Sequence, residues 1–559
     1  MKDQKNIIIA IVLSMAILFG FQYFFSSTPP AKVAPQPVAQ QANPLTEAVP
    51  QKPLTREEAL KAAGHRLLIQ SSSVKGSLNL EGATFDDLTL IQYRETVKPN
   101  SPEIILLSPQ HSQKAYYARF GWTSPNLNLP NEKTVWETNG LNLTPQTPVT
   151  LTWDNGQGLT FHQIISIDEH YMFTITQKVT NKGTTAVSLA PHGVLARQGI
   201  PVTAGFFILH EGPVGVFDGK LNDPSYEDVS KTGSLQNPKA PGWLGYTDKY
   251  WLTAFVPDPK AAITSSYGHQ GTGEQTLYSA TYQRDPLTLE PGHSIEATDH
   301  FFAGAKVLSL LDGYETTLGI NHFDLAVDFG WFYFLTKPIF YVLDFLQDFL
   351  GNFGLAILAL TVIIKLIFFP LANKSYASMG KMKALQPEIE KIRERYKDDR
   401  LKMNEKVMEV YKKEKVNPMA GCLPMIIQIP VFFALYKVLF VSIEMRQAPF
   451  YGWIHDLSAP DPTTIFNLFG LIPWTPPSML MIGAWPLIMG ATMFLQQKLS
   501  PPPADPTQAK LFMFMPILFT YLLAQFPAGL VIYWAWNNTL SITQQWFIMR
   551  RSEIKKVKK

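Results

Sequence analysis

The sequence predicts a polytopic α-helical membrane protein of six spans that carries a large β-sandwich domain outside the membrane. Only 17% of the 559 residues are charged, whereas ordinary soluble proteins contain about 25%. Hydrophobic residues make up 46% of the chain, and long apolar runs lie near the N-terminus and throughout the C-terminal part. Between them lies a stretch of short β-type runs. A single soluble domain is therefore excluded.

The first apolar run extends over nineteen residues from Ile7 to Phe25, which as a helix would span about 28 Å, close to the thickness of a bilayer core. A cleaved signal peptide is the alternative, but its apolar region is usually about 7–15 residues long. We expect an uncleaved anchor over residues 1–27. Lys2 and Lys5 precede it and predict a cytoplasmic N-terminus. Residues 28–60 are rich in proline and predict an extended linker.

Residues 61–325 predict one large β-sandwich, because short β-branched and aromatic runs alternate with Gly, Asn, Asp and Pro. The clearest run places Phe173, Ile175, Gln177 and Val179 on one side of an extended chain, with polar residues between them. Because side chains alternate across a strand, we expect this side to face the core.

An aromatic run follows at residues 326–350, and its placement decides the topology. The interruption at Lys337–Pro338 and the two acids Asp344 and Asp348 favour a helix that lies in the membrane interface. If this helix does not cross, residues 372–418, which contain thirteen Lys or Arg, lie in the cytoplasm. This is the side that the positive-inside rule requires.

The remaining apolar runs then cross in alternating directions. They are residues 351–371, followed within residues 419–549 by Leu423–Val441, Met479–Leu495, Leu511–Phe526 and Leu530–Met549. Arg446 is the only Lys or Arg between Ile443 and Ser478, which are predicted outside, whereas the tail 550–559 contains six. This asymmetry predicts that both termini are cytoplasmic.

Motifs for nucleotide binding, zinc proteolysis and serine hydrolysis are absent from the sequence. The single cysteine, Cys422, excludes an intrachain disulfide and a cysteine-based metal cluster. We therefore expect no cofactor, no bound metal and no enzymatic activity.

Lys365 lies inside the second span, where an ionisable side chain costs about 2.5–3.5 kcal/mol. The structural alternative is that its stem extends to the membrane surface near Pro370. Polar residues on three spans favour a hydrated cavity around Lys365 over a dry helix seam. They are Thr361, Gln428, Asn538, Ser541 and Gln545. The last three recur at helical spacing and predict one polar stripe on the last helix.

Apolar side chains of the third and last two spans are expected to form a wall opposite this stripe. They are Ile429, Phe432, Met513, Phe514, Tyr533 and Trp534. In the cytoplasmic segment 372–418, apolar spacing predicts two helices that meet near Asp398 and Asp399, the first kinked at Pro387. Its four methionines, Met379, Met382, Met403 and Met408, predict an adaptable apolar surface. The basic tail could bind anionic lipid, bind ribosomal RNA or anchor the last helix.

Three segments carry a resemblance to a known family: VNPMAGCLPMIIQIPVFFALYKVL, RQAPFYGWIHDLSAPDP and FMPILFTYLLAQFPAGLVIYWAWNNTLSITQQWFI. They resemble the YidC family of membrane protein insertases, and the resemblance covers the whole chain, as in Gram-negative members with a large periplasmic domain. It implies an inner-membrane protein whose five-helix insertase core encloses a water-filled groove, open to the cytoplasm and to lipid but closed toward the periplasm. It also implies a periplasmic β-sandwich of the galactose-mutarotase type.

The resemblance also implies roles for individual residues. Lys365 matches the positive charge of the groove, where many members have arginine; lysine keeps the charge but loses the planar, bidentate donor. Groove or client-contact positions are implied for Thr361, Gln428, Ile429, Phe432, Tyr533 and Trp534, and the cytoplasmic hairpin is expected to receive clients. The implied partners are nascent membrane proteins, the phospholipid bilayer, the Sec translocon and the ribosome, the last through the basic tail and cytoplasmic loops.

Two other functions stay open from the residues alone. A secondary transporter would also place an ionisable residue in a polar cavity, although no internal repeat relates the five spans. A membrane-tethered enzyme of sugar metabolism would use the exported domain, where lone histidines in a β-sandwich are more often structural. These histidines are His162, His170, His192 and His210.

Overall fold

The computed structural model of the protein describes residues 54–201, 209–330, 332–397, 399–414, 416, 423–474, 476–477, 480–500 and 506–557. The predicted N-terminal anchor and residues 28–53 of the predicted linker lie outside this part of the chain. The end of that linker is helical, because Thr55 and Glu58 form a reciprocal capping box that starts α2 (Arg56–Ala62). Residues 56–60 therefore belong to a helix rather than to an extended linker.

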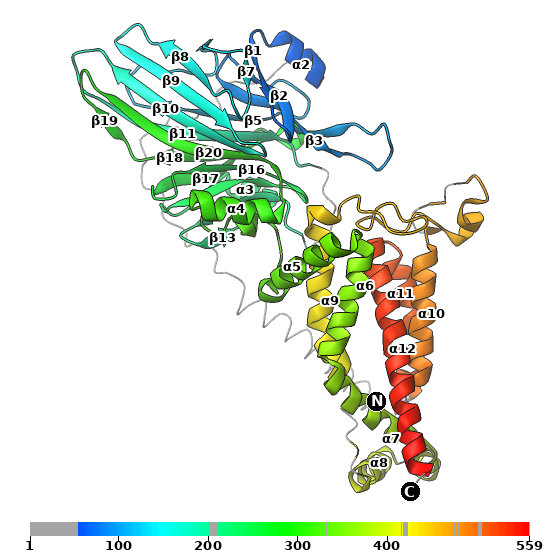
Figure 1. Ribbon diagram of the computed structural model, residues 1–559. Coiled ribbons are helices and arrows are strands. Elements are labelled where there is room, and N and C mark those ends of the chain that lie inside the picture. Colours follow the sequence, from blue (N-terminus) through cyan, green and yellow to red (C-terminus); the bar gives the residue numbers. More distant parts are fainter. Residues whose placement is uncertain are drawn as a thin grey trace. The chain divides into compact units, whose positions relative to one another are not determined.

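Two β-sheets form a sandwich between residues 66 and 305, as the sequence predicted (Figure 1). Among the described residues the first sheet contains, in spatial order, β14 (Ser234–Gln236), β17 (Ile263–Gln270), β18 (Leu277–Arg284), β11 (Val187–Gln198), β5 (Tyr116–Thr123), β3 (Thr84–Arg94), β2 (Val74–Asn79), β1 (Arg66–Gln70) and β7 (Asn142–Leu143), with β19 (Leu287–Leu289) beside β11 and β4 (Glu103–Leu107) beside β3. The second contains β13 (Lys220–Asn222), β12 (Gly212–Phe217), β15 (Gly242–Thr247), β16 (Trp251–Pro257), β20 (Ser294–Ala305), β10 (Met172–Asn181), β9 (Leu159–Ile167), β8 (Val149–Asp154) and β6 (Glu137–Thr138).

Aromatic side chains from both sheets meet in the core of the sandwich. The ring of Phe85 in β3 lies 5.3 Å from that of Phe173 in β10, edge to face, and Phe120 in β5 lies 5.0 Å from Phe255 in β16. Burying each phenylalanine contributes about 1.5–3 kcal/mol. The predicted alternation in β10 is confirmed, because its alternate residues from Phe173 to Val179 are buried and those between them are partly exposed.

Two short helices lie between strands of the sandwich, α3 (Tyr226–Thr232) and η1 (Gly273–Gln275). Two more, α4 (Leu308–Leu318) and η2 (Phe323–Ala326), join the sandwich to the helical part of the chain. The longer helices follow: α5 (Tyr333–Leu350), α6 (Phe353–Ile367), α7 (Phe369–Arg395), α8 (Arg400–Lys413), α9 (Leu423–Val441), α10 (Ala484–Leu499), α11 (Pro506–Leu523) and α12 (Ala528–Val557), with η4 (Ile443–Met445) and η5 (Ile465–Gly470) between α9 and α10. Figure 1 shows α6, α9, α10, α11 and α12 side by side.

α9 has the bounds of the predicted apolar run, whereas α10 ends at Leu499 rather than Leu495, α11 at Leu523 rather than Phe526 and α12 at Val557 rather than Met549. The chain also bends between α6 and α7. The predicted second span extends to residue 371, but α6 ends at Ile367 and α7 starts directly at Phe369, bent by 70°. Pro370 lies in the first turn of α7, where its missing N–H is tolerated. In the described part of the chain, α6 and α7 together, but no helix by itself, have the length and apolar composition needed to cross a membrane.

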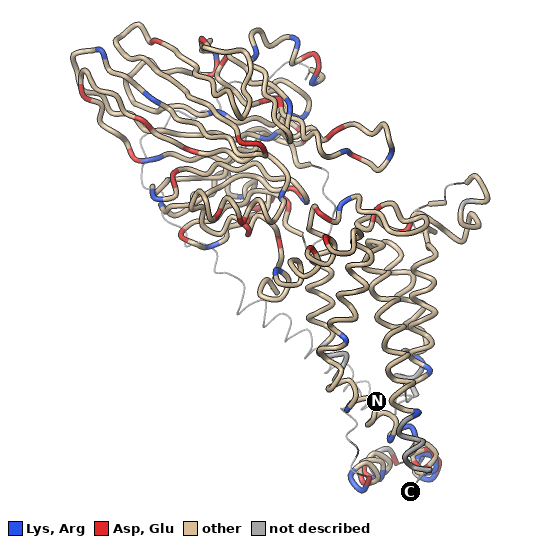
Figure 2. Tube along the Cα trace, in the orientation of Figure 1, with Lys and Arg blue, Asp and Glu red and all other residues tan. Residues whose placement is uncertain are grey.

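Charged side chains are unevenly distributed along the helices. Figure 2 shows few of them along α6, α9, α10 and α11, whereas Lys and Arg gather on α7 and α8. The two helices of the basic segment meet as predicted, since Asp399 caps the N-terminus of α8 by accepting from the Lys402 N–H at 3.0 Å. α7 continues through Pro387 as one helix.

Lys337 fastens α5 to the residues that precede it. Its Nζ lies 3.0 Å from Asp312 Oδ1 in α4 and 2.6 Å from Asp324 Oδ2 in η2. Burial disfavours its charged form, but the hydrogen bonds to Asp324 and Asp312 outweigh burial and raise the pKa of Lys337. α5 is one continuous helix through Lys337 and Pro338, the two residues that interrupt its apolar run. Lys337 connects this helix to α4 and η2.

Glu444 connects the end of α9 to α4. It lies in η4, and its Oε1 accepts a hydrogen bond of 3.1 Å from the N–H of Leu308, the first residue of α4. Its Oε2 is inaccessible and has no hydrogen-bond partner among the described residues. Burial, with a smaller contribution from Asp344, raises the pKa of Glu444 to about 7.

We predict that Glu444 makes the folded protein less stable as the pH rises from about 4.3, the value of a free glutamate, to about 7. The folded state keeps a proton there that the unfolded chain releases, so the free energy of unfolding falls over this window. Glu444→Gln cannot ionise and should melt a few degrees higher than the native protein at pH 8, but not at pH 4. Thermal denaturation in detergent measures this, with the exposed Asp348→Asn as the control. Equal melting temperatures at both pH values would contradict it.

Candidate functional site

Lys365 lies in the last turn of α6, an otherwise apolar helix. Its Nζ donates a hydrogen bond of 2.6 Å to Oγ of Ser541 in α12. Ser541 Oγ in turn donates to the carbonyl oxygen of Asn537, one turn earlier, at 2.8 Å. No ion pair between described residues involves Lys365. The ammonium is therefore stabilised by a hydroxyl, without a counter-ion in this part of the chain.

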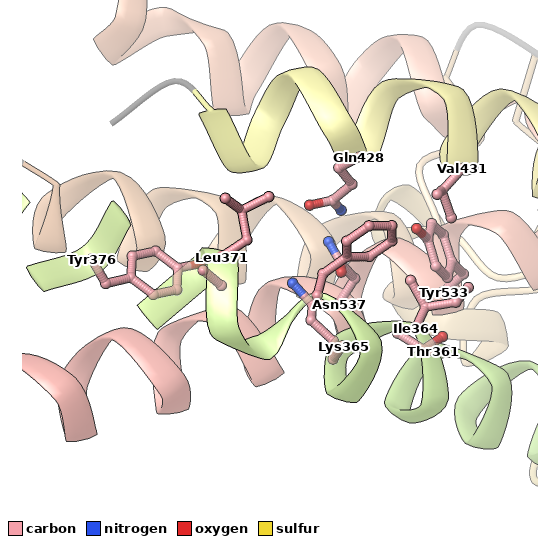
Figure 3. A pocket seen from close by; sticks show the side chains of 11 residues that line it. Thr361, Ile364, Lys365, Leu371, Tyr376, Gln428, Val431, Tyr533 and Asn537 are labelled. Carbon is pink, nitrogen blue, oxygen red and sulfur yellow. The ribbon is translucent and has the colours of Figure 1, made fainter. Parts of the chain in front are cut away.

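A cavity surrounds the end of the Lys365 side chain between α6, α7, α9 and α12 (Figure 3). It is lined by Thr361, Ile364, Lys365, Phe368, Leu371, Ala372, Tyr376, Gln428, Val431, Tyr533 and Asn537. Figure 3 shows the amide groups of Gln428 and Asn537 beside the Lys365 nitrogen. Water-sized molecules can occupy about 50 Å³ of it, and one water needs about 10–15 Å³. The cavity can hold a few waters or a short polar side chain.

Hydroxyl groups connect the helices around this cavity. The Tyr533 hydroxyl of α12 is hydrogen-bonded to Gln428 of α9, and the Tyr376 hydroxyl of α7 is hydrogen-bonded to Ser541. Thr361 lines the cavity, but its own hydroxyl donates to the carbonyl of Ile357 at 2.7 Å. Polar side chains from four helices thus meet at the cavity, and Lys365 is the only charged residue among those that line it in the described part of the chain.

The polar face of α12 differs from the predicted stripe by one residue. Tyr533, Asn537 and Ser541, spaced by four, face the cavity and its lysine. Asn538 is turned toward α10 instead, where its amide donates to Thr492 Oγ1 at 3.3 Å. Gln545 is only 1% exposed and its amide has no partner among the described residues. The predicted stripe did not include Asn537. Its position one turn before Ser541 is the sequence feature that could have predicted its place at the cavity.

Of the residues predicted to form an apolar wall, some are exposed and others pack against each other. Ile429 of α9 is 47% exposed and Met513 of α11 is 55% exposed. Phe432 and Trp534 pack against each other with ring centroids 4.7 Å apart, and Trp534 also lies 5.8 Å from Phe519 of α11. The prediction for Tyr533 was wrong in one respect: this residue lines the polar cavity rather than the opposite wall.

The four methionines of the cytoplasmic segment do not form one surface. Met379 and Met382 of α7 are buried with Tyr376, Val416 and Ile548, because they face the last helix. Met403 is partly buried, and Met408 of α8 is 45% exposed. The part of the predicted methionine surface that a partner can reach therefore lies on α8.

The basic tail continues α12 as a helix as far as Val557. Arg550 lies over the ring of Trp546, 5.1 Å from its centroid, which is an attractive cation–π contact. Because both residues belong to α12, this contact leaves all three options for the tail open.

The histidines proposed for an exported enzyme are separated in the sandwich. His162 Nδ1 lies 3.0 Å from Thr152 Oγ1, and His210 Nε2 lies 2.8 Å from the Pro213 carbonyl oxygen. Burial, followed by the charge of Arg119, lowers the pKa of His192 to about 4. His170 is exposed. These environments are those of structural histidines.

Comparisons with known proteins agree with this architecture. The family model of the YidC periplasmic domain matches residues 66–342, and that of the 60Kd inner membrane protein matches residues 345–556. The membrane protein insertase YidC of Bradyrhizobium diazoefficiens is 48% identical over 99% of this chain and 97% of its own length.

Two solved structures are also similar. An active YidC insertase with its first transmembrane domain resolved is 16% identical, over 86% of this chain and 92% of that chain, with a TM-score of 0.36. A galactose mutarotase related enzyme from Lactobacillus acidophilus is 10% identical, over 43% of this chain and 97% of that chain, with a TM-score of 0.32.

The family model of the periplasmic domain covers the whole β-sandwich and ends within α5, where the second model starts, and the identity to the relative extends across both parts. The sandwich is therefore a periplasmic domain, and the protein is an inner-membrane protein. The chain belongs to the YidC family of membrane protein insertases.

Proposed function

We propose that the protein inserts membrane proteins by receiving their short polar tails in the cavity beside Lys365, while their apolar segments pass into lipid along α9 and α11. The observation that carries this proposal is the Lys365 ammonium, held by the Ser541 hydroxyl in a cavity between apolar helices. Coulomb attraction strengthens as the dielectric constant falls. An acidic residue of an incoming tail would therefore be attracted to this site.

Partitioning of the apolar segment supplies the driving force, so no nucleotide is needed. About fifteen leucine-like residues contribute about −7 kcal/mol, whereas one acidic residue at the bilayer centre costs about 3 kcal/mol. The cavity's role is to lower the barrier for the polar tail. The membrane potential would assist an acidic tail in moving outward.

The exposed side chains on three helices support a route for the client. Met408 on α8 offers a flexible apolar contact in the cytoplasm. Ile429 and Met513 then expose apolar surface on α9 and α11. Phe432 and Trp534 lie in contact between these helices. As the client moves into lipid, the two rings would have to separate or the client would have to pass beside them.

The proposed topology has six spans, with both termini in the cytoplasm and α5 in the membrane interface. The exposed aromatic side chains of α5 support its part of this arrangement: Phe334, Phe345 and Phe349 are strongly exposed and recur at helical spacing. A single exposed aromatic stripe is typical of a helix that lies on a membrane. The Sec translocon and the ribosome are proposed partners, the ribosome through the basic tail.

We predict that Lys365→Ala slows the insertion of clients with acidic tails about tenfold, the effect of losing about 1.4 kcal/mol of attraction. Clients with neutral tails should insert at nearly the normal rate. In vitro insertion of matched clients into vesicles measures both, and Lys365→Arg, which keeps the charge, is the control. Equal insertion of both clients by Lys365→Ala would remove Lys365 from the mechanism. Normal activity of Lys365→Glu would show that the sign of the charge is irrelevant.

Hydration of the cavity can be tested with a single cysteine. After Cys422→Ser removes the native cysteine, Asn537→Cys should react with a small charged thiol reagent added from the cytoplasmic side, because Asn537 lines the cavity. Met489→Cys is the matched control, since Met489 is fully buried between α10 and α12. Labelling is read by mass spectrometry. Equal protection of both cysteines would indicate a dry helix seam.

The client path can be tested by photocrosslinking during synthesis of a short single-span client on ribosomes. Crosslinkers at Ile429, Phe432 and Trp534 should capture the nascent span only while it emerges. A crosslinker at Phe494, an exposed apolar residue of α10, is the control and should not. Absence of crosslinks from all three positions, with the client still inserted, would contradict the route and reopen the transporter alternative.

A further inference from the structure

The loop between α9 and α10 closes one end of the helical bundle with residues 454–463, called here the plug segment. Ile454 and Leu457 in it are completely buried. Leu457 packs on Gly529 at the start of α12, where an added Cβ would lie 3.2 Å from the Leu457 carbonyl oxygen and 3.4 Å from Ile357 of α6. The segment therefore places apolar side chains between the ends of two helices that line the Lys365 cavity.

Backbone groups of the plug segment also cap α12. The N–H of Ala528 donates to the carbonyl of Ala459 at 2.7 Å, and the N–H of Gly529 donates to the carbonyl of Leu457 at 2.9 Å. The first N–H groups of a helix have no partner within the helix. The plug segment supplies partners for two of them and so is joined directly to the cavity helix.

Asp461 attaches the same segment to α10. Its Oδ2 accepts from the Trp485 N–H in the first turn of α10 at 2.9 Å. Its Oδ1 accepts from Trp453 Nε1 at 3.1 Å and from the N–H and hydroxyl of Thr463 at 3.0 and 2.7 Å. The carboxylate is 3% exposed and lies at a helix N-terminus, where a negative charge is stabilised. One side chain thus holds both the plug segment and α10.

The plug segment lies close to the cavity and on the periplasmic side. Tyr533 lines the cavity five residues after Ala528, which corresponds to about 7.5 Å along α12. Glu444, at the same end of α9 as the loop, is hydrogen-bonded to Leu308 of the periplasmic domain. Only a short length of packed protein therefore separates a hydrated cavity from the periplasm.

We propose that the plug segment is the permeability barrier between the Lys365 cavity and the periplasm, and that Asp461 is the positioning residue that keeps it closed. The inference rests on the proposed function in one respect, a hydrated cavity open to the cytoplasm. A tail that leaves the cavity must displace the plug segment. The hydrogen bonds of Asp461 can re-form afterwards, because all its partners lie in this loop or in the first turn of α10.

Two substitutions weaken the hydrogen bonds of Asp461 in different ways. Asp461→Asn keeps the shape and the Oδ1 acceptor but removes the charge and places an amino group opposite the Trp485 N–H. Gly483→Ala keeps the charge but puts a Cβ 2.5 Å from Asp461 Cγ, so the carboxylate must move. The matched control is Asp456→Asn, because among the described residues Asp456 Oδ1 accepts only from Gln447 and Ser458 of the same loop and not from α10 or α12.

The experiment measures proton leak through the full-length protein in vesicles of phosphatidylethanolamine and phosphatidylglycerol, using an enclosed pH dye under an imposed potential. Losing one hydrogen bond to a charged acceptor shifts an opening equilibrium about tenfold. We therefore expect about tenfold faster leak for Asp461→Asn and Gly483→Ala, and no change for Asp456→Asn. Insertion of a neutral-tailed client into the same vesicles shows that each variant is folded.

Normal leak in both Asp461→Asn and Gly483→Ala, with insertion retained, would overturn the proposal, and so would an equal leak in Asp456→Asn. A loss of insertion without leak would also overturn it, because Asp461 would then serve the client path. If the native protein failed to insert the client, the proposed function would be wrong. The comparison of leak rates among the variants would still test the barrier.

Discussion

The arrangement of the helices depends on one constraint, that an ammonium group lies among apolar helices and must be solvated there. Removing a cation from water costs several kcal/mol unless polar groups replace the water. For Lys365 the replacement is the Ser541 hydroxyl and a cavity large enough for a few waters. This requires α6 to lie against the polar face of α12. The cavity also brings in α9 through Gln428 and α7 through Tyr376.

The two ends of this site are built differently. At the end where α12 begins, backbone hydrogen bonds to Ala528 and Gly529 and the Asp461 carboxylate hold the loop before α10 against the helices. At the other end, α6 ends soon after Lys365 and the chain bends by 70° into α7. Because of this bend, the basic helices that follow do not extend the bundle. The proposed one-directional transfer of a polar tail would make use of this asymmetry.

The periplasmic sandwich has a core in which aromatic residues from both sheets interlock. Buried apolar residues continue from this core into the helices, among them Phe323, Leu343 and Ile357. Polar contacts add to this junction: the carboxylates that bind Lys337, and Glu444 at the start of α4. The boundary between the two family models, at residues 342–345, therefore lies within α5 and not at a gap in the packing.

The sequence by itself determined the class of protein, the strand pattern of β10, the range of α9 and the position of the one ionisable residue in an apolar helix. Each of these follows from hydrophobic periodicity and charge, which are local properties. Only the tertiary structure decided that Asn537 rather than Asn538 faces Lys365, that Tyr533 joins the cavity and that Met379 and Met382 are buried. Adjacent helical residues point about 100° apart, so the rotation of each helix against its neighbours selects which one faces the site. That rotation is set by contacts between residues far apart in the chain, such as Lys365 and Ser541.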